Sequence, residues 1–337
     1  MYLIDPNKRQ YKANLHCHSV LSDGKKTPQE LKEMYKGHGY SILSITDHEY
    51  PKNHSYLNDK DFLTITGYEA YIRTNPDYIY DVYAKELHLN LFAREPENEA
   101  CVCYTRKSCK YFTEEEHEKI KKVGSQRDRE YSVKYVNEFI RTARENGYIV
   151  AYNHPWWSME DEADVLAYDG FFSMEMCNFS SYGDGCLEYN GGIYDKMLLR
   201  GKRVACHGAD DNHNALPENS IGFDSFGAFA MIMPDEFTYD SVFSAMEHGE
   251  MYSSMGPLFK SVEMHGNKIH IECSDVERIA VFTGSKAPKM RFANIGETIN
   301  SADLEIDDRA KFVRVSICDK YKLHADTRGF FRDELEF

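Results

Sequence analysis

Two histidines at the end of a short apolar segment are the side chains in this sequence best placed to do chemistry. His16 and His18 are two positions apart, and a polar turn that carries Asp23 follows them. On an extended strand, side chains two positions apart point to the same face, so both imidazoles can reach one cation. Two alternating histidines on a solvated strand are common, however. The pair indicates a metal site only if other segments of the chain supply further ligands.

Several other apolar segments are also followed by imidazole or carboxylate side chains. The pattern predicts strands over residues 11–15, 41–46, 62–67, 86–92, 148–152, 172–176 and 203–206. Each later strand carries or precedes a candidate ligand, and these are His48, Glu69, His88, His154, Glu175, Asp211 and His213. The carboxyl ends of parallel strands meet at one mouth of a barrel, so we expect these side chains to converge there. Any one of them alone would more simply be a buried histidine or a capping carboxylate, but the set predicts a multinuclear metal site.

The segments between these strands have helical signals. Thr27, Pro28 and Glu30 give an N-cap, a proline in the first turn and a capping box, and Gly39 ends that helix. Further helices are predicted over residues 131–146 and 190–200, each followed by a glycine. Alternating strands and helices predict an α/β fold with a parallel sheet.

The pattern changes near Pro257. Residues 268–273, 278–282 and 311–317 have strand periodicity without helical segments between them. We therefore expect one domain over residues 1–257, which carries the candidate metal ligands, and a small β-rich domain over residues 258–337, which has no set of candidate ligands.

Composition excludes some classes of function. The chain has 337 residues, 42% of them hydrophobic, and a formal net charge of -15 without a basic stripe, which argues against a nucleic-acid polymer as partner. It has no apolar run of the roughly 18 residues that a membrane span needs. Nine cysteines without framework spacing favour reduced thiols, so a cytoplasmic protein is expected. Three of them, Cys101, Cys103 and Cys109, form a cluster for which a structural metal is the less favoured interpretation.

The motifs resemble a known family when they are taken together. His-Cys-His with Ser-Asp-Gly, Thr-Asp-His, Gly-Tyr-Glu, the mid-strand His88, Asn-His-Pro and Asp-Asn-His occur in this order within residues 11–256. The ordered set resembles the PHP (polymerase and histidinol phosphatase) superfamily of metal-dependent phosphoesterases. The resemblance implies a distorted (β/α)7 barrel, similar to a TIM barrel, that holds two or three divalent ions. The Ser-Asp-Gly turn and residues 251–257 are similar to the branch that includes carbaryl-hydrolase-like proteins.

The resemblance also implies three groups of metal ligands. The first ion would be held by His16, His18, Glu69 and Asp211; the second by Glu69, His88 and His154; and the third by Asp23, His48 and His213. Mixed imidazole and carboxylate ligands suit zinc, manganese or iron better than calcium. Glu69, Asp23 and His213 would be the catalytic residues among them.

Four neighbouring polar residues are not among the implied metal ligands. Glu175 and Asn178 are expected to orient imidazoles or water rather than to bind metal. Asp210 and His207 flank the last motif, where they are open to contacts with a ligand or with the substrate.

The expected function is hydrolysis of a small phosphorylated metabolite or nucleotide by a hydroxide held between two ions. Two alternatives remain: a carbamate or amide hydrolase on the same site, and a non-catalytic metal-binding module that supports a partner protein. Oligomerisation is compatible with the sequence.

Two groups of residues and one segment are candidates for contacts with the substrate. Arg106, Lys107 or Lys110 could bind phosphate or belong to a solvated loop, and Trp156 and Trp157 could form a wall of the site or pack on its rim. Residues 182–194 could be a lid or only a connection.

Overall fold

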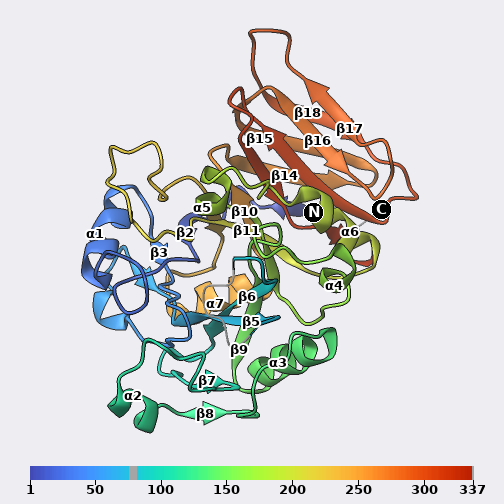
Figure 1. Ribbon diagram of the computed structural model, residues 1–337. Helices are drawn as coiled ribbons and strands as arrows, with labels where there is room; N and C mark the ends of the chain where they lie inside the picture. The colour runs from blue at the N-terminus through green and yellow to red at the C-terminus, as the bar shows by residue number, and fades with distance from the viewer. Residues whose placement is uncertain (76–81, 336–337) are drawn as a thin grey trace.

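The computed structural model describes residues 1–75 and 82–335, whose strands fall into four sheets (Figure 1). A five-stranded sheet has the order β11 (Ala205–Ala209), β10 (Ser173–Asn178), β9 (Tyr148–Tyr152), β6 (Glu86–Ala93) and β5 (Gly67–Arg73). A second sheet runs from β17 (Lys289–Phe292) through β16 (Arg278–Phe282), β19 (Phe312–Cys318), β20 (His324–Thr327), β13 (Met251–Ser254), β12 (Phe229–Ile232), β2 (Tyr11–Asn14) and β3 (Ile42–Leu43) to β4 (Leu63–Thr64), with β21 (Phe330–Phe331) paired to β19. The third sheet is β1 (Tyr2–Ile4), β14 (Phe259–His265), β15 (Lys268–Val276) and β18 (Ile299–Glu305), and the fourth is β7 (Cys101–Val102) with β8 (Lys122–Val123).

The five-stranded sheet is mixed rather than parallel. Strands β9, β10 and β11 are parallel, but β6 runs antiparallel to both β5 and β9. His88 therefore reaches the common end of the sheet from near the start of β6, and not from the carboxyl end of a parallel strand. The antiparallel pairing of β5 with β6 runs in register from Gly67 opposite Phe92 to Arg73 opposite Glu86.

Backbone hydrogen bonds join the two larger sheets beside the candidate ligands. Isolated bridges pair Cys17 with Asn212 and His48 with Glu69, and the N–H of Asp211 donates to the carbonyl of His16 at 2.9 Å. The structure confirms a mixed α/β fold. It does not confirm a closed (β/α)7 barrel, because the described strands belong to separate sheets and few helices alternate with them.

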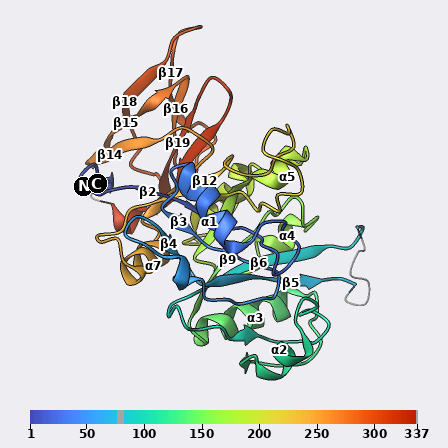
Figure 2. The same ribbon diagram turned by 90° about the vertical axis from the view of Figure 1, so that its left-hand side faces the viewer.

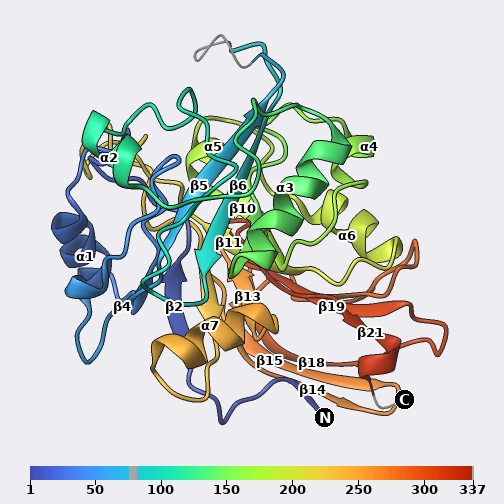
Figure 3. The ribbon, with the colours of Figure 1, turned by 90° about the horizontal axis from the view of Figure 1, so that it is seen from below.

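The described helices lie at the outside of the sheets. They are α1 (Pro28–Gly37), α2 (Glu114–Lys119), α3 (Val133–Glu145), α4 (Glu162–Val165), α5 (Phe179–Gly183), α6 (Gly191–Leu199) and α7 (Tyr239–Glu247), with the short 3-10 turns η1 (Ser55–Leu57) and η2 (Arg332–Glu334). Figure 3 shows α3 and α6 on one side of β5 and β6, and α1 on the other. None of the helices in residues 1–75 and 82–335 is long and apolar enough to cross a membrane.

The three predicted helices are confirmed to within about two residues at each end. In α1 the Thr27 side chain accepts from the N–H of Glu30, whose carboxylate accepts from the N–H of Thr27, so the capping box is formed. Both this pair and the proline at the start of α1 act within one turn, and local sequence therefore predicts them well.

Residues beyond 257 are rich in strands, as expected, and gather at one side of the molecule, away from α2 and α3 (Figure 2). They are joined to the earlier chain by strand pairing, since β20 pairs with β13 and β14 pairs with β1. Buried Arg314 on β19 adds ion pairs to Asp195 on α6 and to Asp326 on β20. The division into two domains at residue 257 stays a prediction.

Candidate metal centre

Four buried ligand atoms converge where the two larger sheets meet. The Nε2 atom of His16 lies 3.0 Å from Glu69 Oε1 and 3.1 Å from Asp211 Oδ1. The Nε2 atom of His18 lies 3.0 Å from Asp211 Oδ1 and 3.2 Å from His16 Nε2. Around a tetrahedral ion with ligands at about 2.0 Å, neighbouring ligand atoms are ~3.3 Å apart, so these four side chains fit the spacing of one metal site.

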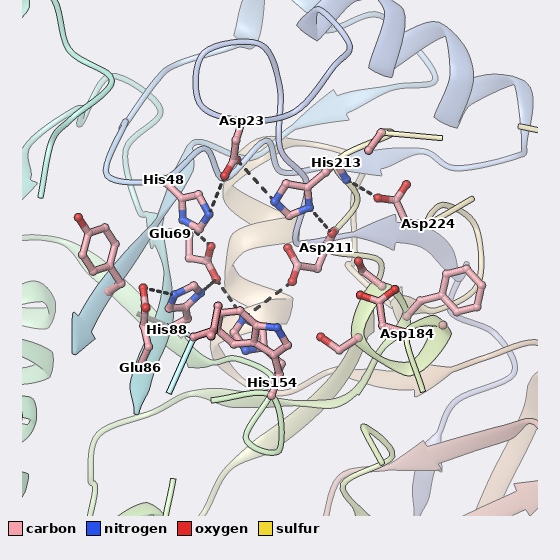
Figure 4. A pocket seen from close by; sticks show the side chains of 18 of the residues that line it. Asp23, His48, Glu69, Glu86, His88, His154, Asp184, Asp211, His213 and Asp224 are labelled. Carbon is pink, nitrogen blue, oxygen red and sulfur yellow. Dashed lines mark hydrogen bonds and ion pairs between the residues drawn. The ribbon is translucent and has the colours of Figure 1, made fainter. Parts of the chain in front are cut away.

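Two further groups share residues with the first. The ligand atoms of His48, Glu69 and His88 lie within 4.8 Å of one another, and so do those of His18, Asp23, His48 and His213. Figure 4 shows Asp23, His48 and His213 on one side of Glu69, and His88 and His154 on the other. His18 and His48 therefore belong to more groups than the sequence predicted.

His154 lies close to these groups but forms looser contacts. Its Nε2 atom is 3.4 Å from Glu69 Oε1 and 3.8 Å from Asp211 Oδ2. Both His154 and Asp211 have positive φ angles, 23° and 54°. Non-glycine residues adopt this conformation at a cost of about 1–3 kcal/mol, and such strain clusters at functional sites.

The charges of the site are strongly coupled. Burial alone would lower the pKa of His16, but the carboxylates of Asp211, Glu69 and Glu175 raise it well above its usual value. Burial would raise the pKa of Asp23, but the nearby imidazoles lower it to about 2. Three carboxylates, Asp23, Glu69 and Asp211, are thus kept ionised among imidazoles.

Two buried atoms at the centre have unused bonding capacity. His48 Nδ1 and Glu69 Oε2 lie 2.9 Å apart, but without hydrogen-bond geometry, and neither has another hydrogen-bond partner in the described residues. Buried polar atoms are rarely left unpaired, and each costs about 1–3 kcal/mol. A cation that accepts both lone pairs would satisfy them, so the residues present fit a divalent metal.

Other buried side chains orient these candidate ligands. Glu175 Oε1 lies 2.7 Å from His16 Nδ1, and its other oxygen accepts from the N–H of His154 at 2.9 Å. Asn178 donates to both Glu175 and Asp211. A carboxylate on the far nitrogen of an imidazole is the usual way to orient a histidine ligand. Glu175 thus orients an imidazole, as the sequence interpretation expected, whereas Asn178 orients two carboxylates.

His88 is held between two carboxylates. Its Nδ1 atom is 3.0 Å from Glu69 Oε1 and its Nε2 atom is 3.0 Å from Glu86 Oε1. Burial opposes protonation, but these two acids raise the pKa of His88 to about 10. Glu86 also forms an ion pair with Arg73, and both line the cavity described below.

A buried ion pair fixes the turn that carries His48. Glu49 follows His48 with a φ of 57°, its N–H donates to the carbonyl of Glu69, and its carboxylate accepts from the N–H of Tyr71. Both Glu49 oxygens also accept from the guanidinium of Arg129. This bidentate pair ties the His48 turn to β5, the strand that carries Glu69.

Seven of the nine candidate ligands line an open cavity of about 660 Å³, and His16 and His18 are buried beneath it. Arg73, Lys110 and Trp157 line it, and the Trp157 ring lies 5.1 Å from the ring of His88 and 4.9 Å from that of His154. Trp157 is thus a wall of the site, whereas Trp156 does not line the cavity. The start of the 182–194 segment also reaches it, through Gly183 and Asp184 at the end of α5.

Other residues singled out in the sequence lie outside the cavity. Arg106 pairs with Glu114 and Lys107 lies 3.7 Å from Asp128. Asp210 accepts from the N–H groups of residues 226–228 and from the hydroxyl of Tyr35, so it anchors that loop.

His207 is buried behind the ligands, where its Nδ1 atom lies 2.8 Å from Ser173 Oγ. It does not line the cavity.

The cysteine cluster has a different composition from the predicted one. Cys101 and Cys109 have sulfur atoms 3.7 Å apart and Glu49 beside them, while Cys103 is not in the group. Because both Glu49 oxygens are bound by Arg129, these residues do not form a convincing metal site.

Besides Glu49 and Glu86, sequence reasoning missed three further carboxylates that position the site. Asp47 accepts from the N–H and hydroxyl of Ser19 and thereby shapes the turn between His18 and Asp23. Glu188 accepts from the N–H of Trp157, and Asp224 accepts from the N–H of His213. Asp47 is adjacent to His48 and could have been noticed, but nothing in the sequence links the other two to the site.

Sequence comparison with protein-family models and with curated proteins finds no match. Solved structures are similar in fold. One is a two-domain protein from Bacteroides vulgatus that contains a predicted PHP-like metal-dependent phosphoesterase; it is 13% identical, with 97% of this chain and 96% of that chain covered and a TM-score of 0.48.

Another similar structure is an inferred metal-dependent phosphoesterase from Bifidobacterium adolescentis, 15% identical, covering 65% and 93% of the two chains at a TM-score of 0.38. A third is an amidohydrolase from Chromobacterium violaceum with bound sulfate and no metal, 14% identical, covering 60% and 87% at a TM-score of 0.40. The similarity is one of fold at low identity, and the branch of carbaryl-hydrolase-like proteins is not tested by it.

Proposed function

We propose that this protein is a metal-dependent hydrolase that acts on phosphoesters of small molecules. The observation that carries the proposal is the convergence of buried imidazole and carboxylate atoms at an open cavity. The proposed ligands are the nine residues His16, His18, Asp23, His48, Glu69, His88, His154, Asp211 and His213. The overlapping groups favour two or three ions, and mixed nitrogen and oxygen ligands favour zinc, manganese or iron.

Divalent ions at this position would lower the pKa of water and offset the negative charge that develops on a phosphoryl group. The protein's own side chains orient the candidate ligands. Glu69 lies between the groups, and Glu175 and Glu86 hold His16 and His88 in fixed orientations. Trp157 packs against the rings of His88 and His154 and so restrains their positions.

Two further contacts are proposed for the substrate. Arg73 and Lys110 line the same cavity and are placed to receive phosphoryl oxygens. Asp23 and His213 lie at the more exposed edge of the site, where an ion held by them would offset the charge of a departing alkoxide.

A second candidate is a carbamate or amide hydrolase on the same ligands. It is favoured by the apolar side chains in the cavity wall, among them Phe179 and Phe223. The two candidates differ in the bond that is cleaved, not in the metal site.

The test is elemental analysis of the purified protein together with phosphate release from nucleotides and sugar phosphates in the presence of manganese. We expect two to three ions per chain and turnover of at least one phosphomonoester. His16→Ala is the control, and it should reduce kcat/KM by more than about 100-fold because a direct ligand is lost. Stoichiometric metal with cleavage of carbamates or amides only would favour the second candidate. A protein that binds no metal under any of these conditions would refute both.

A further inference from the structure

A loop over residues 214–223 is tied to the candidate metal centre at its base. The Asp224 carboxylate accepts from the N–H of His213 at 2.7 Å and from the N–H of Asn214 at 3.1 Å, so the two ends of the loop meet (Figure 4). The Asn214 side chain adds a hydrogen bond to Ser225 at 2.8 Å. A compact surface loop with adjoining ends is frequently functional.

The loop presents apolar side chains to the cavity and to solvent. Leu216 and Ile221 both line the cavity, with 49% and 108% of their surfaces exposed. The loop also packs on itself, because a Cβ atom at Gly222 would lie 2.8 Å from Leu216 Cδ1. Leu216 therefore lies against the backbone of Gly222, the residue that follows Ile221.

Two further apolar side chains, Phe223 and Phe179, line the same cavity, together with candidate metal ligands such as Glu69 and Asp211. Single exposed apolar residues need no explanation, but an apolar surface that continues into a polar cavity marks a binding site. At about 660 Å³ the cavity takes a drug-sized molecule, which is more than a phosphate group alone fills.

We propose that residues 214–223 are a substrate-binding loop and that the substrate is an ester with an extended apolar group next to the reacting bond. The inference rests on the proposed function, since the reacting group must lie at the candidate metal centre. Leu216 and Ile221 then contact the part of the substrate that does not react and determine specificity.

The first test is a series of n-alkyl phosphates from methyl to hexyl, hydrolysed by the metal-loaded protein. Burial of a methylene contributes about 0.8 kcal/mol, so kcat/KM should increase about two- to fourfold with each methylene that reaches the loop. In the variant Leu216→Ser/Ile221→Ser this dependence on chain length should be lost.

The control is Ile295→Ser. Ile295 is 106% exposed, as Ile221 is, but it lies between β17 and β18 and does not line the cavity. Its replacement should leave the chain-length dependence unchanged. A dependence that persists in the double variant, or that is absent from the wild-type protein, would overturn the inference.

A binding measurement separates this inference from the proposed function. Calorimetry with methyl- and hexylphosphonate and the metal-loaded protein reports on the apolar contact without turnover. A hexyl preference that the double variant loses would support the loop assignment even if no phosphoester is hydrolysed. If neither phosphonate binds, or if the double variant changes only the oligomeric state in light scattering, the apolar side chains do not contact substrate and the inference is wrong.

Discussion

At the level of single residues, the carboxylates of the site have two different roles. Those that face the cavity are candidate ligands, and those behind it orient the imidazoles. Glu69 approaches His16, His48 and His88 directly, whereas the contacts of Glu175 to candidate ligands are with the far nitrogen of His16 and the backbone of His154. Both are fully buried and both have lowered pKa values, since the neighbouring imidazoles outweigh the effect of burial. Burial and pKa therefore do not separate a ligand from an orienting residue, but geometry does.

This division leads to a prediction about metal content. Glu69→Gln should remove most of the bound metal, because one carboxylate oxygen is replaced by an amide nitrogen that cannot bind a cation. Glu175→Gln should weaken metal affinity by about 10- to 100-fold, the usual effect of altering an orienting partner. Elemental analysis after dialysis against buffers of defined free metal measures both. Equal metal loss in the two variants would make Glu175 a direct ligand.

At the level of elements, short strands and turns hold the ligands, so the positions of the ligands depend more on the contacts between elements than on the strands themselves. Strand β3 has only two residues, yet the turn that follows it carries His48. Glu49 and Arg129 fasten that turn to β5, and their side chains are 0% and 5% exposed. Arg129 comes from the segment before α3, so this helix region supports the site from outside the cavity.

We expect Arg129→Met to lower the free energy of unfolding by about 3–5 kcal/mol, because Glu49 would be left as a buried, unpaired charge. Urea denaturation measures this change. Arg127→Met is the matched control: Arg127 is 53% exposed, and its ion pair with Glu138 should contribute no more than about 1 kcal/mol. Adding Glu49→Gln to Arg129→Met should recover part of the stability, and no recovery would show that the ion pair is not the cause.

At the level of the whole molecule, segments distant in sequence are joined around one charged centre. The candidate ligands extend from His16 to His213, and β1 and β2 at the start of the chain pair with β14 and β12. Without a cation, the ionised groups at this centre have incomplete hydrogen bonding. Metal binding should therefore stabilise the fold as well as support catalysis.

We expect chelation with EDTA to lower the melting temperature by several degrees, and manganese or zinc to restore it. A ligand present at 100 times its Kd stabilises a protein by about 2.7 kcal/mol, and about 1 kcal/mol corresponds to roughly 1–2 °C in a chain of this size. Differential scanning calorimetry measures the shift. Asp211→Asn should show a smaller response to chelation than the wild-type protein, and an equal response would place the stabilising metal elsewhere.

Much of the fold was predictable from local signals. The capping box of α1, the strand β9 and the helices α3 and α6 follow from residues within a few positions of one another. The types of side chain that gather at the centre were also predictable, because His, Asp and Glu follow one apolar segment after another. Such signals act over one turn or one strand, and the sequence displays them directly.

Contacts between distant segments were not predictable in the same way. The reversed direction of β6 and the support of His213 by Asp224 depend on how separate segments pack, and so do the partners of Asp210 and Asp211, although Asp211 was already the expected ligand. Asp210 and Asp211 are chemically identical neighbours, yet the backbone turn directs one to the N–H groups of residues 226–228 and the other, at a φ of 54°, to the imidazoles. Residue type and spacing thus account for the chemistry that the chain can perform. Which side chains meet, and which apolar loop borders them, depends on long-range backbone pairing that no local pattern encodes.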